Sequence, residues 1–256
     1  MPDFKVASAE FKRQLVTLDL LLVTVEVTSQ QDGLTPVLVG QEPLPVLPAD
    51  GKNTMAAAAI VLLAAHFEEY VRQQIEEYAT GVMDYHDYLP DNLREKIVDS
   101  YWRAGTNGLS RIRPSGFPGW INKADLLLRS LTEYPVEANV AAFHKKLIVE
   151  HENNMRFDTM AEVCARVGIK GLSDLIYRSK PVRDILGSPK KDQFAAALRR
   201  DVNEFYEIRN GIVHSIAQNA GIGRTVVTKW SIFFDCLTLS SGSRIGGVVR
   251  EVSFGH

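Results

Sequence analysis

The sequence predicts a mainly α-helical bundle with an irregular, proline-rich N-terminal arm and a small β-rich C-terminal tail. Apolar residues recur every three or four positions through the middle of the chain, which is the period of a helix that buries one face. Four prolines lie between residues 31 and 50 and exclude a regular helix there. Residues 225–254 are rich in β-branched residues and glycine, which favours short strands. We therefore divide the chain into residues 1–52 (N-terminal segment and connector), 53–220 (helical domain) and 221–256 (tail).

The composition is that of a globular protein. Of the 256 residues, 45% are hydrophobic and 23% are charged, which excludes disorder of the whole chain. A net charge of −2 excludes a histone-like polycation but leaves room for a local basic patch. Two cysteines without a CxxC pair predict neither a disulfide scaffold nor a cysteine-rich zinc site, and favour a reducing compartment.

No targeting or membrane segment stands out in the sequence. The N-terminus mixes charges throughout and lacks the apolar region of a signal peptide. The longest apolar run, residues 55–65, has eleven residues, whereas a membrane span needs roughly 20. We therefore expect a soluble, cytoplasmic protein that does not interact with a membrane.

The first 80 residues hold one ambiguous segment, one connector and one clear helix. Residues 7–28 fit either a helix or a pair of strands, because valine and threonine obscure the period. Residues 31–50 form an extended connector that a turn at Asp50-Gly51 closes. Asn53 or Thr54 can then cap a long helix to Tyr78, with Gly81 beyond its end.

Further helices follow as far as residue 186. We expect one from Pro90 to about Gly105, a loop over residues 105–119, and another from Asn122 that ends before Pro135. Three more helical stretches cover residues 135–152, 158–167 and 172–186.

The last predicted helix has the clearest pattern. Ser188-Pro189 is a start signal, and the helix extends to about Asn219 before glycines end it. Seven apolar residues at helical spacing form one buried face. They are Phe194, Leu198, Val202, Phe205, Ile208, Ile212 and Ile216.

This helix contains RNGIVH, residues 209–214, the motif with the most chemical content. Asn210 and His214 are four residues apart and share a face, and Arg209 is long enough to reach toward it. Gly211 costs roughly 1 kcal/mol of helix propensity, so close approach of an RNA backbone or a partner helix would explain it. A surface histidine and an arginine paired with a nearby glutamate explain the same residues without any function.

The chain resembles the HEPN superfamily, whose signature is an arginine, often a polar residue after it, and a histidine four to six residues after the arginine. Arg209, Asn210 and His214 match that pattern on a late helix. Three blocks make the chain most similar to the RiboL-PSP-HEPN branch, and the resemblance covers about residues 54–220. They are AAHFEEYVRQQI (64–75), EHENNMRFDTMAEVCARVGI (150–169) and EIRNGIVHS (207–215).

The resemblance implies metal-independent cleavage of RNA at a site composed of two motifs across a homodimer. His214 would take the proton of an RNA 2′-OH, and Arg209 would stabilise the charge that the phosphorane gathers. Asn210 would orient the histidine or bind a phosphate oxygen. Glu68 matches a carboxylate that the branch places on an early helix, where it would orient Arg209 or His214. The alternative for Glu68 is a solvated charge beside Glu69.

The implied role is a toxin or antiviral-defence endoribonuclease, with a cognate antitoxin or defence-system partner. A different class remains open: a catalytically silent HEPN dimer that serves as a binding or regulatory module. A helical regulator that binds nucleic acid through a basic loop is a third possibility.

A basic and aromatic stretch is the second candidate site. Between residues 101 and 123 there are four basic residues and no acidic one: Arg103, Arg111, Arg113 and Lys123. Trp102, Phe117 and Trp120 lie among them, so the segment could bind phosphates and stack a base. The alternative is a loop whose aromatic rings pack on the core.

The sequence predicts no metal site and no cofactor. It contains no HExxH, no P-loop and no GxGxxG. His86 with Asp84 and Asp87 could bind a cation, but a tyrosine-rich polar loop accounts for the same residues.

Overall fold

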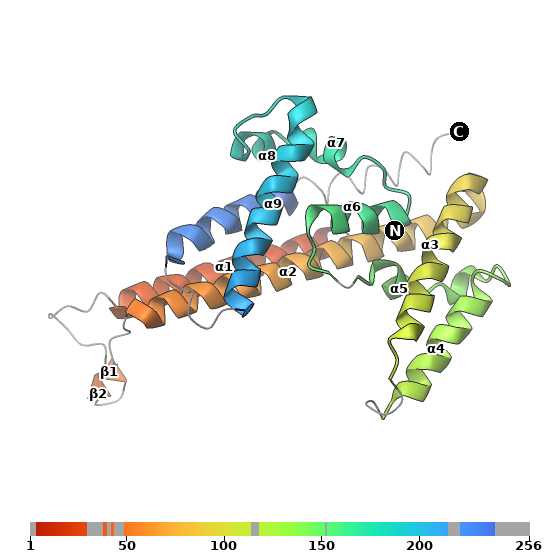
Figure 1. Ribbon diagram of the computed structural model, residues 1–256, viewed down its shortest axis with the longest axis horizontal. Helices are drawn as coiled ribbons and strands as arrows, with labels where there is room; N and C mark the ends of the chain where they lie inside the picture. Colours follow the sequence, from red (N-terminus) through yellow and green to blue (C-terminus); the bar gives the residue numbers. More distant parts are fainter. Residues whose placement is uncertain are drawn as a thin grey trace. The chain divides into compact units, whose positions relative to one another are not determined.

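The computed structural model describes residues 4–29, 38–39, 42–43, 49–113, 118–151, 153–214 and 221–238 (Figure 1). These parts are almost entirely helical, which confirms the predicted mainly α class. The strands in them are β1 (Leu38–Val39) and β2 (Glu42–Pro43), which pair antiparallel. Most of the predicted proline-rich connector lies outside the described residues.

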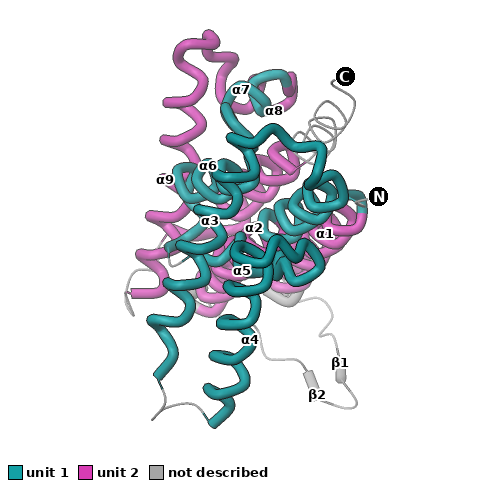
Figure 2. Tube along the Cα trace, turned by 90° about the vertical axis from the view of Figure 1, so that its right-hand side faces the viewer, with its two compact units in different colours: residues 1–5, 71–178, 241–256 teal, residues 6–70, 179–240 magenta. Residues whose placement is uncertain are grey.

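The chain forms two compact units (Figure 2). The first unit comprises residues 1–5, 71–178 and 241–256, and the second comprises residues 6–70 and 179–240. Helix α2 (Ala49–Asp84) belongs to the second unit as far as Tyr70 and to the first unit from Val71. The RNGIVH motif and Glu68 belong to the second unit, whereas the basic stretch belongs to the first.

The second unit is held together by a continuous row of aromatic rings. It contains most of α1 (Phe4–Ser29), the first part of α2, α8 (Lys180–Ile185), α9 (Lys191–His214) and a helix over residues 224–238. The Phe67 ring lies 4.2 Å from that of Phe234, which lies 4.6 Å from that of Phe205. Phe11 of α1 meets Phe67 edge-on at 6.2 Å, so α1, α2, α9 and the helix 224–238 share one core.

The helix over residues 224–238 corrects the prediction of a β-rich tail. Val227, Trp230, Phe234 and Leu237 recur at three and four residues and are all at most 3% exposed. This is helical spacing, and burial of these side chains outweighs the β-propensity of Thr228 and Ile232, the β-branched residues between them. The rest of the predicted tail lies outside the described residues.

The ambiguity of residues 7–28 is resolved as a single helix, α1. Its buried residues are Ala7, Phe11, Leu18 and Leu22, which lie along one face at helical spacing. The β-branched residues that obscured the period lie mostly on the other face. Packing of the inner face therefore decides the structure here.

Helix α2 is longer at both ends than predicted. It begins at Ala49, so the expected turn at Asp50-Gly51 is wrong, and it continues through Gly81 to Asp84. Ala79 and Val82, which flank Gly81, are at most 3% exposed, and their burial offsets the roughly 1 kcal/mol that glycine costs a helix.

Within the described residues, α2 is also the one helix long and apolar enough to cross a membrane. A core helix meets the same criterion. Ile60, Leu63 and Phe67 are at most 1% exposed, so much of its apolar surface is packed inside the protein.

The first unit is built around α3 (Asp91–Ser110), which contacts α4 (Trp120–Glu133), α5 (Lys145–Val149) and α6 (Phe157–Arg166). A Cβ at Gly105 would lie 2.5 Å from Leu131 Cδ2, so the absent side chain lets α4 pack closely on α3. Three short helices complete the unit: η1 (His86–Tyr88), η3 (Val140–Ala142) and α7 (Leu172–Tyr177).

Several predicted helix boundaries in residues 91–219 are corrected. Helix α3 runs to Ser110, and residues 135–152 contain only η3 and α5. The stretch 172–186 is two helices, because Pro181 lies in the first turn of α8 and fits a helix start. Helix α9 begins at Lys191, since Ser188 has a φ of 53° and cannot belong to it. The predicted end at Asn219 lies outside the described residues.

Candidate functional site

The motif occupies the last turns of α9, where the buried face gives way to exposed positions. Phe194, Leu198, Val202 and Phe205 are at most 1% exposed, as the spacing predicted. Ile208 and Ile212, one and two turns further on, are only half-buried. The helix therefore emerges from the core just where the RNGIVH residues begin.

Arg209 and Asn210 are joined by a hydrogen bond. The Arg209 Nη1 donates to Asn210 Oδ1 over 3.1 Å, and both residues are half-buried. The Arg209 Nε is buried and has no hydrogen-bond partner among the described residues. Glu204, which is near this arginine in the sequence, accepts instead from Lys229 Nζ at 3.1 Å. The guanidinium thus retains donors that an anion could accept.

His214 and Gly211 are exposed on the same part of α9. A Cβ at Gly211 would meet no atom of the described residues within 4 Å, so their packing does not require glycine there. The imidazole, one turn beyond Asn210, is open to a ligand.

Glu68 is half-buried on α2, within the same unit as the motif. It follows Phe67, whose ring packs on Phe234, and Phe234 packs on Phe205 of α9. The core therefore joins the segments that carry Glu68 and Arg209, but the predicted orienting contact remains a prediction.

The basic residues of the second candidate site lie on or next to α3 and α4. Arg103 lies within the predicted helix, on α3, and pairs with Asp99 at 3.1 Å, so one of the four cations is partnered. Because α3 runs to Ser110, the loop begins later than residue 105. Arg111, Arg113 and Lys123 are exposed, and Trp120 is half-buried at the start of α4. Trp102 is 47% exposed, whereas Phe117 lies outside the described residues.

Among the residues that the structure describes, no three histidine, cysteine or acidic side chains gather where they could hold a metal ion. His86 packs its ring edge-on against Tyr134 with the centroids 5.9 Å apart, and its Nδ1 lies 3.5 Å from Asp87.

The family model of RiboL-PSP-HEPN matches residues 41–237, most of the chain. The chain belongs to the RiboL-PSP-HEPN family. The match extends beyond the resemblance noted above at both ends, and it includes the helix over residues 224–238 that packs on α9. It leaves out α1. No curated protein and no solved structure matches the chain.

Membership of the family makes the RNGIVH residues the first candidates for a functional site. HEPN domains include ribonucleases and nucleotide-binding modules, so the family supports either activity for this chain. The site itself offers a half-buried guanidinium with unused donors, an amide that contacts it, and an exposed imidazole. Within the described residues, these contacts add no residue to the site that the sequence predicted.

Proposed function

We propose that this RiboL-PSP-HEPN protein is a metal-independent endoribonuclease of the toxin or antiviral-defence type. The observation that carries the proposal is the arrangement at the end of α9. Arg209 has a buried Nε without a partner, and His214 is exposed one helical turn beyond Asn210. The guanidinium of Arg209 suits an anion such as a phosphate, and the imidazole of His214 suits a group that gives up a proton.

The chemistry needs one base and one cation beside the scissile phosphate. The His214 imidazole takes the proton of the 2′-OH, and the 2′-oxygen attacks the phosphorus. The Arg209 guanidinium donates two directed hydrogen bonds to the phosphorane oxygens. The bond to the 5′-oxygen then breaks, and this oxygen takes up a proton. Products end in a 2′,3′-cyclic phosphate and a 5′-hydroxyl.

A homodimer that brings two motifs together would improve each step. Two arginines would stabilise the phosphorane better than one, and the second histidine, when protonated, would supply the proton for the leaving 5′-oxygen. Glu68 would orient Arg209 or His214 on its own subunit. Arg111, Arg113 and Lys123, which are exposed, would bind flanking phosphates together with Arg103, and Trp120 would stack a base.

The test is incubation of the purified protein with mixed RNAs in EDTA, followed by analysis of the product ends. We expect cleavage that persists in EDTA and leaves 5′-hydroxyl ends. The His214→Ala protein, prepared identically, controls for contaminating ribonuclease. Ends that carry a 5′-phosphate, or activity that returns only with Mg²⁺, would contradict the proposal. RNA binding without cleavage would favour the silent binding module.

A further inference from the structure

Helix α1 has an exposed apolar face opposite the face that packs on the rest of the second unit. Three large apolar residues beyond its first third are open to solvent: Val16 is 59% exposed, Leu20 is 61% and Val27 is 55%. Val6, near the start of the helix, is 64% exposed. So many exposed apolar side chains on one face favour a binding surface over chance.

These residues belong to a regular seam. Positions separated alternately by three and four residues line up along one side of a helix, as the a and d positions of a coiled coil do. We call the set the α1 seam. It consists of Val6, Ala9, Arg13, Val16, Leu20, Val23 and Val27.

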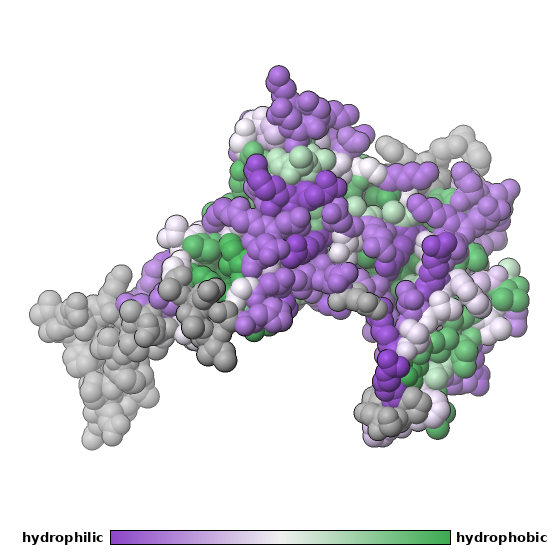
Figure 3. Space-filling view, viewed as in Figure 1, coloured by the Kyte–Doolittle hydropathy of each residue, from purple (hydrophilic) through white to green (hydrophobic). Residues whose placement is uncertain are grey.

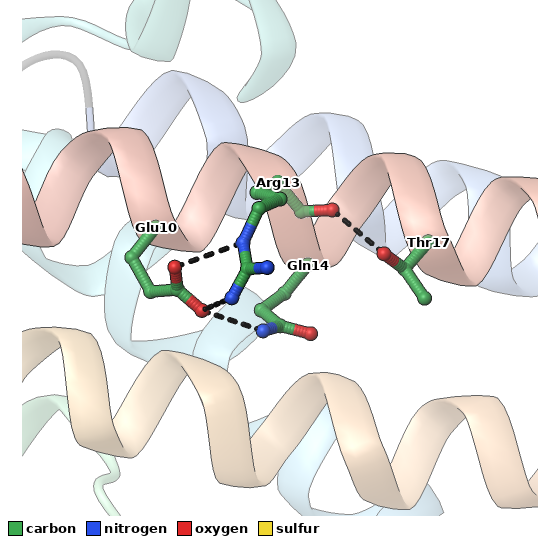
Figure 4. A network of polar contacts seen from close by, with 4 residues as sticks. All are labelled: Glu10, Arg13, Gln14 and Thr17. Carbon is green, nitrogen blue, oxygen red and sulfur yellow. Dashed lines mark hydrogen bonds and ion pairs between the residues drawn. The ribbon is translucent and has the colours of Figure 1, made fainter.

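The one charged member of the α1 seam is turned aside. Arg13 donates to Glu10 through Nε at 3.0 Å and Nη2 at 2.7 Å, and Gln14 donates to the same carboxylate at 2.6 Å (Figure 4). The hydrogen bonds from Arg13 and then Gln14 lower the pKa of Glu10. With its guanidinium held toward Glu10, Arg13 leaves its aliphatic stem along the seam.

Charges on one flank of the seam are arranged by sign. Lys5, Lys12, Asp19 and Glu26 follow one another at seven-residue intervals, so they occupy the same flank. The first two are basic and the last two are acidic. Arg224 of the helix over residues 224–238 pairs with both Asp19 and Glu26.

We propose that the α1 seam binds the seam of a second copy of this chain, antiparallel, about a twofold axis near Val16. A twofold contact places each residue opposite a different residue of the same surface. With opposite directions, the same flank of each helix faces the other, so Lys12 lies beside the partner's Asp19 and Lys5 beside the partner's Glu26. A parallel pair would not bring these opposite charges together.

Most of the apolar positions meet one another in the same register, and in the two layers beside the axis the aliphatic stem of Arg13 packs on the partner's Leu20. Val16 meets the partner's Val16 at the axis, and Val6 meets the partner's Val27 at each end. The smaller Ala9 meets the partner's Val23. From Val6 to Val27 the seam is about 31 Å long at 1.5 Å per residue, or three heptads. Helix α1 lies outside residues 41–237, so this contact is a feature of this chain beyond its family domain.

The first test measures the oligomeric state of Leu20→Glu by sedimentation. A charge placed in the seam loses its water on pairing, so we expect the dimer dissociation constant to rise by at least about 10-fold. Leu128→Glu is the matched control, because Leu128 is a similarly exposed leucine (55%) on α4, where apolar side chains also reach the surface (Figure 3). Circular dichroism checks that both variants fold.

A monomeric wild-type protein, or a Leu20→Glu protein that dimerises as tightly as Leu128→Glu, would overturn the proposal. The first result would mean that another segment of the chain covers the seam. The second result leaves the proposed RNA cleavage untouched, because the seam contains none of the motif residues. A monomeric wild-type protein would also count against a site composed of two motifs, but a single motif could still cleave RNA.

The second test fixes direction by disulfide formation in a Cys236→Ser background, where the remaining Cys164 is buried. Cysteines bridge only when their Cα atoms lie within about 7 Å. In the antiparallel pair Val16→Cys links two copies, whereas Val27→Cys does so only when mixed with Val6→Cys. Val27→Cys chains that link to each other would show a parallel pair and overturn the proposed direction.

Discussion

Arg209 and His214 stand five residues apart on one helix but differ in burial. The Arg209 Nε is buried without a partner, and its Nη1 is engaged by Asn210, whereas His214 is exposed. A half-buried guanidinium whose Nε lacks an acceptor costs free energy that a bound phosphate would recover. At the residue scale, this difference predicts different consequences when each is removed.

His214→Ala and Arg209→Ala should each lower RNA cleavage by at least about 10²-fold, because each removes either the base or the anion stabiliser. His214→Ala should leave RNA affinity nearly unchanged, since a neutral imidazole attracts phosphate weakly. Arg209→Ala should weaken affinity as well, because its charge holds the substrate. Cleavage rate, RNA affinity at fixed salt and circular dichroism are measured on each variant.

Mixing the two inactive proteins tests whether the site is composite. In a mixed dimer one subunit supplies His214 and the other supplies Arg209, so part of the activity should return. A His214→Ala protein that cleaves at the wild-type rate while folded would rule out a catalytic role for the motif.

At the scale of the element, the glycine at position 211 of α9 is not explained by packing within the described residues. A Cβ there would touch none of their atoms within 4 Å. Gly211→Ala should therefore raise the free energy of unfolding by about 0.5–1 kcal/mol and, if RNA or a partner helix approaches this point, lower cleavage. Urea unfolding and cleavage rate are the measurements.

Val213→Ala is the control for Gly211→Ala. It also raises helix propensity at an exposed position, 49% accessible, but it removes atoms. If both variants are more stable and only Gly211→Ala cleaves more slowly, RNA or a partner helix approaches the backbone at Gly211. Equal cleavage in both would exclude it.

The helix over residues 224–238 supports α9 through Phe234, whose ring contacts Phe67 and Phe205. Phe234→Ala should lower the free energy of unfolding by about 3–5 kcal/mol, because it leaves a cavity in the aromatic row. Ile232→Ala on the same helix, at a position 52% exposed, should change it by less than about 0.5 kcal/mol. Similar losses for the two variants, measured by urea unfolding, would contradict the packing described.

At the scale of the whole molecule, burial of weak acids makes stability depend on alkaline pH. Burial raises the pKa of Cys164 from 9.0 to about 12 and those of Tyr78 and Tyr134 from 10.0 to about 12. The folded state keeps these protons after the unfolded state has released them. The contribution is complete below about pH 9 and is lost as pH rises toward 12.

We therefore expect the free energy of unfolding, measured in urea, to fall steadily from pH 9 to pH 11. In Cys164→Ala the fall between pH 9 and pH 10 should be smaller, because the tyrosines titrate from about pH 10 in the unfolded chain and Cys236, whose pKa burial also raises, is only half-buried. A free energy that stays constant over this interval would show that these groups titrate alike in both states.

The sequence by itself determined the mainly α class, the buried face of α9 and the family. Phe194, Leu198, Val202 and Phe205 have a period that no strand accommodates, and the RNGIVH residues with the two other blocks indicated RiboL-PSP-HEPN. For the candidate site, the sequence selected Arg209, Asn210 and His214. It did not contain the hydrogen bond between Arg209 and Asn210 or the burial of Nε, because these depend on rotamers that neighbouring helices restrict.

Only the tertiary structure decided the elements whose local signals conflict. Residues 224–238 and α1 carry many β-branched residues, and Gly81 is a helix terminator by propensity, yet all are helical. Propensities differ by less than about 1 kcal/mol per residue, whereas burying a side chain such as Phe234 contributes about 1.5–3 kcal/mol. Phe234 is buried against Phe67, which is far away in the sequence. The burial energy therefore exceeds the propensity difference, but it depends on a contact that a local sequence pattern does not contain.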